Sequence, residues 1–217
     1  MPSTVRRVLG VVVVVLGGAL AISGAWNAVS LGPSGEARFS VTSKDPGALV
    51  VEPVVLNSVE APARITATRS DGGGVLLVVA PSVDARAVLG RSAVSTVSGV
   101  HYPAGTLELR SSGVGAPTGI TTADVWRLSA KGAGSARLVV NQGVGPETAV
   151  VASGDASALR DVTMTLTWAD RAWFFDALAV ALIGSIVAVF ALGDLWHTRS
   201  EAAGSTRPGH PHKGVTT

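Results

Sequence analysis

The sequence predicts a mainly β fold, in which an exported, β-sandwich-like domain with one short helix is flanked by two transmembrane α-helices. The chain has 217 residues and a mean hydropathy of +0.43, but its apolar excess is concentrated in one segment near each end. Between these segments, short β-branched runs alternate with Gly, Pro, Asp and Ser, which is typical of sandwiches and barrels. The predicted parts are a cytoplasmic N-terminus (1–7), a first span (8–28), the β-rich domain (29–171), a second span (173–196) and a disordered cytoplasmic tail (197–217).

The first apolar segment is long enough to cross a bilayer. No charged residue occurs from Val8 to Gly35. At about 1.5 Å of rise per residue, such a helix covers a hydrocarbon layer of roughly 30 Å. Trp26 would lie at the outer interface, where aromatic rings are favoured. A competing interpretation is a cleaved signal peptide, because a basic start precedes the segment and small residues precede Trp26.

The second apolar segment has a tryptophan at each end, Trp173 and Trp196, and carries Asp176 and Asp194 near its ends. Both aspartates lie close enough to the ends to reach the headgroup region, so we interpret them as boundaries of the span. The alternative is an intramembrane proton relay or ion site at one of them, because charge inside the bilayer is costly and usually functional.

The orientation follows from the basic residues that flank the spans. Arg6 and Arg7 precede the first span, and Arg199, Arg207 and Lys213 follow the second. Because cytoplasmic flanks carry the excess of Lys and Arg, both termini are predicted to be cytoplasmic and the middle domain extracytoplasmic. The sequence thus predicts a multi-pass protein of the cell membrane, with the lipid bilayer as its first partner.

Small residues recur at four-residue spacing in both spans. Such faces allow two helices to approach closely, so we expect the spans to pack on each other, on a membrane-protein partner or in a homo-oligomer. The residues concerned are Gly17, Ala21 and Ala25 in the first span, and Ala177, Ala181 and Ser185 in the second.

The middle domain contains runs with strand patterns. The alternation in "ARITATR", the glycine-rich turn "SDGGG" and the buried run "VLLVVA" together predict a β-hairpin. In the last run, Val162, Met164, Leu166 and Trp168 fall on one face. Pro53 predicts an edge or a bulge within its run. The other predicted strands are "ARFSV", "ALVVEPVVL", "AVSTVSG", "GTLELR", "DVWRLSA", "ARLVVNQ" and "TAVVAS".

One stretch, "PSVDARAVLG", predicts the short helix. Ser82 can cap its start, and Gly90 can terminate it. Val83, Ala87 and Val88 would fall on one side of this helix.

Three stretches of the middle domain carry a family resemblance: "VLLVVAPSVDARAVLG", "VWRLSAKGAGSARLVVNQG" and "VVASGDASALRDVTMTLTW". Followed by a terminal span, they resemble a group of uncharacterised actinobacterial membrane proteins. The resemblance implies an exported β-domain with a strand, an acid-containing short helix and then a tryptophan strand. It covers most of the exported domain and implies no activity.

The charges argue against a nucleic-acid partner despite a sequence pI near 9.5. Residues 29–171 hold 12 basic and 12 acidic side chains, so the basic excess lies at the membrane flanks. The chain has no cysteine, which excludes disulfides, thiolate zinc sites and a cysteine nucleophile. We expect no catalytic residue, no metal site and no cofactor, and we place the lone His101 in a loop or at a strand end. The tail histidines, His197, His210 and His212, are expected to be part of the disordered tail.

The favoured functional hypothesis is therefore a non-enzymatic domain that binds or scaffolds, as an accessory subunit of a cell-envelope complex. The first alternative is a module that binds or senses cell-wall glycan or peptide, in which Trp126 and Trp168 could form a sugar platform; core packing is the competing role for both. A hydrolase is the second alternative, and it requires acids such as Asp84, Glu108 or Asp124 to converge in a cleft.

Overall fold

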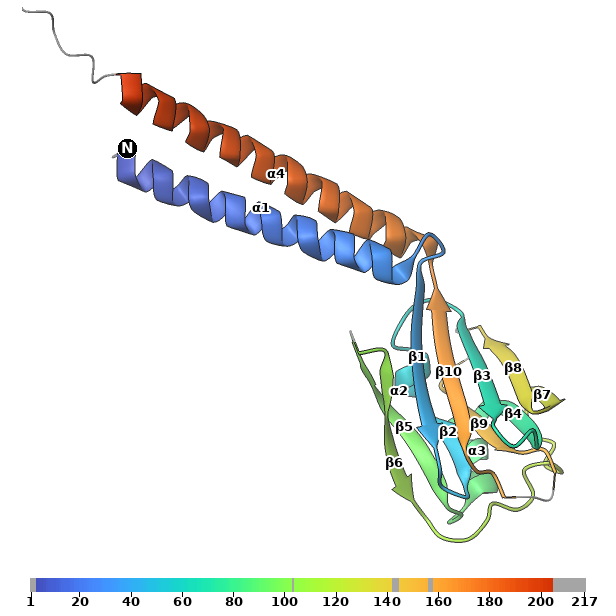
Figure 1. Ribbon diagram of the computed structural model, residues 1–217. Helices are drawn as coiled ribbons and strands as arrows, with labels where there is room; N and C mark the ends of the chain where they lie inside the picture. Colours follow the sequence, from blue (N-terminus) through green and yellow to red (C-terminus); the bar gives the residue numbers. More distant parts are fainter. Residues whose placement is uncertain (1–2, 103, 142–144, 156–157, 205–217) are drawn as a thin grey trace, which may run out of the picture. The chain divides into compact units, whose positions relative to one another are not determined.

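The computed structural model describes residues 3–102, 104–141, 145–155 and 158–204. The chain divides into two compact units. One unit is helical and contains both ends of the chain, up to Pro33 and from Arg171 onward, and the other is the β-domain, Ser34–Asp170 (Figure 1).

The helical unit consists of α1 (Ser3–Leu31) and α4 (Arg171–Gly204). In the part of the chain that the structure describes, two helical segments are long and apolar enough to cross a membrane, Val5–Leu31 and Arg171–His197, with mean hydropathies of 2.5 and 2.4. They contain the predicted spans. α4 continues past Trp196 to Gly204, so the predicted tail begins as helix. The remainder of that tail, including His210 and His212, lies outside the described residues.

The described residues of the β-domain form one sheet of ten strands, in the order β7-β4-β9-β2-β5-β6-β1-β10-β3-β8. The strands are β1 (Glu36–Ser43), β2 (Ala48–Val51), β3 (Ala63–Arg69), β4 (Gly74–Pro81), β5 (Val94–His101), β6 (Thr106–Ser112), β7 (Leu128–Ala133), β8 (Ser135–Val140), β9 (Glu147–Ser153) and β10 (Val162–Ala169). The mainly β prediction is confirmed.

The sheet is nearly closed and barrel-like, so the predicted sandwich is not confirmed. The end strands β7 and β8 are consecutive in the chain and meet at Gly134, whose φ of +72° suits glycine. Between β6 and β1, a short parallel contact pairs Ser40 with Thr106. A sandwich would divide the strands between separate sheets, whereas here the strands form one hydrogen-bonded series, from β7 at one end of the sheet to β8 at the other.

β10 lies between β1 and β3, antiparallel to both. The alternation predicted for it is confirmed, since Val162, Met164, Leu166 and Trp168 are all buried. Trp168 also packs edge-on against Phe39 of β1, with ring centroids 5.7 Å apart. This strand therefore forms one wall of the core.

Three strands, β2, β4 and β9, are buried on both faces, which explains their unbroken apolar runs. On one face, Leu76 and Val78 of β4 pack in a cluster with Ala85 and Leu89 of α3 (Ser82–Leu89) and with Ile120 of a loop. The alternate residues of β4 are also buried.

The described residues of the β-domain contain two short helices, where one was predicted. The additional helix is α2 (Pro53–Leu56). The run "ALVVEPVVL" was predicted to be a single strand, but its strand ends at Val51. Pro53 begins the helix instead of bulging a strand, because its fixed φ and missing N–H suit a first helical position.

α3 confirms the predicted helix but corrects its start and its buried face. Ser82 is the first helical residue and not the cap, and its hydroxyl donates to the carbonyl of Pro146 at 2.8 Å. Of the residues predicted to share one side, Val83 is 76% exposed, whereas Val88 is partly buried and packs against the core cluster that contains Ala85 and Leu89. Gly90 ends the helix as predicted, with a φ of +55° and its N–H donating to Arg86.

The predicted hairpin of β3 and β4 is wrong. β3 pairs with β10 and β8, whereas β4 pairs with β9 and β7. The glycine-rich turn that joins them, in which Gly72 has a φ of +72°, therefore carries the chain between separate parts of the sheet.

Candidate binding site

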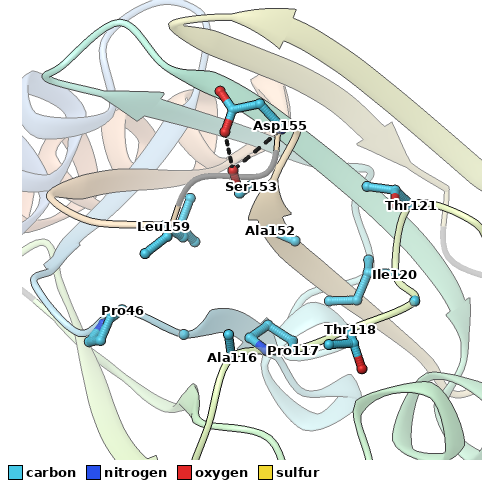
Figure 2. A pocket seen from close by; sticks show the side chains of 13 residues that line it. Pro46, Ala116, Pro117, Thr118, Ile120, Thr121, Ala152, Ser153, Asp155 and Leu159 are labelled. Atoms are coloured by element: carbon cyan, nitrogen blue, oxygen red, sulfur yellow. Dashed lines mark hydrogen bonds between the residues drawn. The ribbon is translucent and has the colours of Figure 1, made fainter.

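The β-domain has a pocket of about 400 Å³ (Figure 2). Two segments supply most of its lining: a loop after β6, and the chain that leaves β9. The lining residues are Pro46, Gly47, Ala116, Pro117, Thr118, Gly119, Ile120, Thr121, Ala152, Ser153, Asp155, Ala158 and Leu159.

The loop wall of the pocket is held in place by a tryptophan. The indole N–H of Trp126 donates to the carbonyl of Ile120 at 2.7 Å, and the Ile120 side chain is buried in the α3 cluster. Trp126 is partly buried and packs against the same cluster. It was predicted to lie in a strand, but it precedes β7. Core packing, and not an exposed platform, is thus the role that its contacts indicate.

The opposite wall is fixed by the carboxylate of Asp155. One oxygen accepts from the hydroxyl of Ser153 at 2.7 Å, and the other accepts from the backbone N–H of Gly74 at 2.8 Å (Figure 2 shows the Ser153 bond). These bonds tie the end of β9 to the start of β4. The pocket wall is therefore joined to the most deeply buried part of the sheet.

A buried guanidinium supports this wall. Arg69, only 5% exposed, donates to both carboxylate oxygens of Asp71, at 2.9 and 2.5 Å, and to Ser153 and the carbonyl of Ala158, each at 3.3 Å. Its hydrogen bond with Asp71 raises the pKa of Arg69. The same bond, followed by the N–H of Gly73, lowers the pKa of Asp71. Arg69 therefore remains charged and links three segments of chain.

This network predicts acid sensitivity of the β-domain. Because the folded pKa of Asp71 lies below its unfolded value of about 3.9, its contribution to stability is complete above that value and is lost as the pH falls through the folded pKa. We expect the melting temperature to fall as the pH is lowered below about 4, and Asp71→Asn to reduce that dependence. Thermal melts followed by circular dichroism measure this, with the exposed Glu60→Gln as control. Identical pH profiles for Asp71→Asn and Glu60→Gln would contradict the prediction.

The pocket is lined mainly by small side chains. Its described lining consists of small aliphatic side chains, prolines, hydroxyls and one carboxylate, without an aromatic ring or a cationic group. Pockets of this kind bind through shape and a few hydrogen bonds. Within the described residues, no group of three or more His, Asp or Glu side chains could hold a metal ion.

Two further polar clusters lie outside the pocket. Asp45 accepts from the hydroxyls of Ser111 and Ser95, at 2.5 and 3.0 Å, and these bonds lower its pKa. His101 ends β5, as predicted, and its Nε2 lies 4.0 Å from Glu108, which also pairs with Arg110.

The three acids of the hydrolase alternative lie on different elements. Asp84 is on α3, Glu108 is on β6 and Asp124 lies in the loop before β7. Glu108 pairs with Arg110 and lies near His101.

In the helical unit, α1 and α4 pack through glycines. A Cβ added at Gly17 would lie 2.8 Å from the backbone N of Ala188, and one added at Gly24 would lie 2.7 Å from the carbonyl of Ala177. A Cβ at Gly184 would lie 2.7 Å from the carbonyl of Gly17. At Gly17, Gly24 and Gly184 the helices thus meet backbone to backbone, whereas at Gly10 the side chain of Leu195 packs against α1. We call these four positions the glycine seam: Gly10, Gly17, Gly24 and Gly184.

The predicted packing residues divide between this seam and the outer surface. Ala21, Ala177 and Ala181 contact seam glycines, as does Gly17 itself. Ala25 and Ser185 are instead exposed. The sequence analysis did not select Gly10, Gly24 or Gly184 as packing residues. A signal existed for the first two, because Gly10, Gly17 and Gly24 recur every seven residues.

The charged and aromatic residues at the ends of the spans are mostly exposed. Arg6 and Asp194 form an ion pair between the helices, with an N–O distance of 2.6 Å. Asp194 was predicted only to mark the end of the second span, and the structure adds an ion-pair partner for it on the first span. Arg7, Trp26, Asp176 and Trp196 are exposed, and Trp173 is partly buried.

No residue was predicted from sequence to line the pocket. Its lining consists of turn and small residues, which carry no catalytic or metal-binding pattern. The signal that the sequence offers is the stretch from Gly113 to Gly119, whose Pro and Gly residues indicate a loop but no binding role. Comparison with protein-family models and with curated proteins found no match for this chain.

Proposed function

We propose that the chain is a two-span membrane protein whose β-domain acts outside the cytoplasm by binding, as an accessory or scaffold subunit of a cell-envelope complex. The pocket of about 400 Å³ is the observation that carries the proposal, because it is a defined concave surface with a rigid support. The protein would act by contact and not by catalysis. Both termini would lie in the cytoplasm.

The glycine seam supports the anchoring part of the proposal. Gly17 and Gly24 of α1 meet the backbone of α4, and Gly184 of α4 meets the backbone of α1, so this pairing uses the closest-packing positions of both spans without a partner helix. Close packing along α1 also favours its retention over cleavage as a signal peptide. A partner is then bound by the β-domain, and not by the seam.

The ligand class that the pocket favours is a polypeptide segment with small apolar side chains. Such a segment would fill the aliphatic lining and hydrogen-bond to Thr118, Thr121 and the loop backbone. Binding of cell-wall glycan is the alternative. Sugar platforms usually stack on aromatic rings, and the described lining provides none.

The test is crosslinking in intact cells, followed by purification of the tagged full chain in mild detergent and mass spectrometry. A partner protein in stoichiometric amount is expected with the natural chain. Ala116→Trp would fill the pocket from its exposed rim and should reduce recovery of that partner at least about tenfold, the loss expected when a central contact is blocked. Val114→Trp, on the same loop but outside the lining, is the matched control.

Two outcomes would change the proposal. Equal recovery with Ala116→Trp and Val114→Trp would mean that the pocket does not contact the partner. Recovery of envelope polysaccharide in place of a protein, lost in Ala116→Trp alone, would establish the glycan alternative.

A further inference from the structure

Another pocket of the β-domain, of about 280 Å³, lies between α3 and the strands β2, β5 and β9. It shares no lining residue with the pocket of Figure 2. Its α3 wall is Arg86, Leu89 and Gly90, and β5 contributes Val94 and Thr96. Pockets for drug-sized ligands usually measure about 300–1,000 Å³, so this volume suits a smaller molecule.

The floor of this pocket is apolar. Val50 of β2 and Leu89 of α3 are each only 7% exposed, and Val94 packs against the cluster that contains both of them. Val50 is also the registered partner of Thr96 on β5, so the two side chains are neighbours on one face of the sheet. An aliphatic group of a ligand would be removed from water on this floor, which favours its binding.

Two opposite charges line the same pocket from different walls. Glu52 directly follows β2 in an extended conformation, with φ of −72° and ψ of 156°, so its side chain lies on the same face as Val50. Arg86 comes from α3 on the other wall. Among the described residues, neither of these two charged side chains forms an ion pair or a hydrogen bond. The pocket therefore offers a carboxylate and a guanidinium to a ligand, with no net charge.

A buried hydroxyl adds an acceptor beside the carboxylate. Val51 is registered with Ala149 in the antiparallel pair of β2 and β9, which places Thr148 next to Glu52. Thr148 is 4% exposed, and its hydroxyl donates to the hydroxyl of Ser82 at 3.0 Å. Its oxygen keeps lone pairs that can accept from a ligand. Acceptors thus gather at the sheet wall, and the guanidinium donors lie at the helix wall.

We propose that this pocket binds a free α-amino acid with a branched aliphatic side chain. The ammonium group of the ligand would bind to Glu52 and Thr148, and its carboxylate would bind to Arg86 through paired N–H donors. Its side chain would pack on Val50 and Leu89. Such a ligand carries both charges that the pocket complements. This small-molecule site goes beyond the proposed binding of a polypeptide segment and does not depend on it.

The test titrates the purified full chain in detergent with L-leucine and follows binding by calorimetry. We expect saturable binding below about 1 mM, the upper end of the range in which enzymes bind their substrates. 4-Methylpentanoate and 3-methylbutylamine keep the aliphatic group of leucine but lack the ammonium and the carboxylate, respectively. Each should bind at least about tenfold more weakly, because a hydrogen bond to a charged group is lost.

Variants with matched controls locate the site. Arg86→Gln and Glu52→Gln should each weaken L-leucine binding at least about tenfold. Arg86→Gln should also remove the preference for leucine over 3-methylbutylamine, since the carboxylate then has no partner. Arg91→Gln and Glu60→Gln remove the same charges from exposed positions outside the lining and should leave binding unchanged.

Three results would overturn the site. The first is the absence of saturable L-leucine binding at millimolar concentration. The second is equal binding of leucine and 4-methylpentanoate, which would indicate a site for anions alone. The third is equal affinity in Arg86→Gln and Arg91→Gln, which would place the ligand elsewhere. None of these results affects the recovery of a partner protein, so failure of this site is distinguishable from failure of the proposed function.

Discussion

Replacing Gly184 with leucine is expected to separate α1 from α4. A Cβ at this position meets the backbone of Ala21 and lies 2.7 Å from the carbonyl oxygen of Gly17. Backbone atoms cannot turn aside as a side chain does, so the helices must move apart. Overpacking of this kind costs about 1–3 kcal/mol, which lowers the paired fraction up to about a hundredfold.

The measurement exploits the absence of cysteine from the chain. Gly10→Cys and Leu195→Cys introduce a unique pair where the two helices meet, and disulfide yield in membranes then reports pairing. Gly193→Leu is the matched control, because no described atom lies within 4 Å of a Cβ added there. Equal yields with Gly184→Leu and Gly193→Leu would show that the seam does not hold the helices together.

The second large effect is expected at Trp168, the largest of the fully buried side chains described in the β-domain. Truncating a buried aromatic side chain to alanine costs about 3–5 kcal/mol. For a domain of this size, that lowers the melting temperature by roughly 10–20 °C. Thermal melts of the full chain in detergent measure the effect. Thr165→Ala, on the opposite face of the same strand, should change stability by less than about 1 kcal/mol.

Trp168→Phe separates packing from polarity. The indole N–H of Trp168 is buried and has no hydrogen-bond partner among the described residues. Phenylalanine keeps the edge-on contact with Phe39 and removes that donor, so Trp168→Phe should cost much less than Trp168→Ala. Equal losses in both variants would mean that the N–H contributes to stability.

Elements whose signal is local could be predicted from sequence. β10 was found because its side chains alternate, and the end of α3 was found at Gly90 because that position requires a positive φ. The two apolar helices were found by length and composition alone. In each case the deciding interaction lies within the segment itself.

Pairing between distant segments could not be predicted. The turn before Gly74 has hairpin chemistry, yet β3 and β4 find other partners, because long-range packing decides which strands pair. The same holds for the near closure of the sheet, which depends on the corner at Gly134 and the contact of Ser40 with Thr106. No local pattern encodes either feature.

The seam and the pocket were missed for a related reason. Both are built largely from residues with small side chains. These residues allow the close approach of the helices and leave the volume of the pocket open, and neither effect has a distinctive sequence pattern. Within the α1–α4 pair, Gly24 meets the carbonyl of Ala177, whereas its neighbour Ala25, one of the predicted packing residues, is exposed. A shift of one residue turns a helical position by about 100°, which spacing alone did not resolve.

The pairing of β1 with β10 has a mechanical consequence. Glu36 and Ala169 are registered partners, so the chain enters and leaves the β-domain at the same end of one antiparallel pair. A force applied to a bound ligand would be shared by the two tethers that lead to α1 and α4, both loaded in the same direction. It would not slide β1 along β10, so their hydrogen bonds would not be sheared while the domain is under tension.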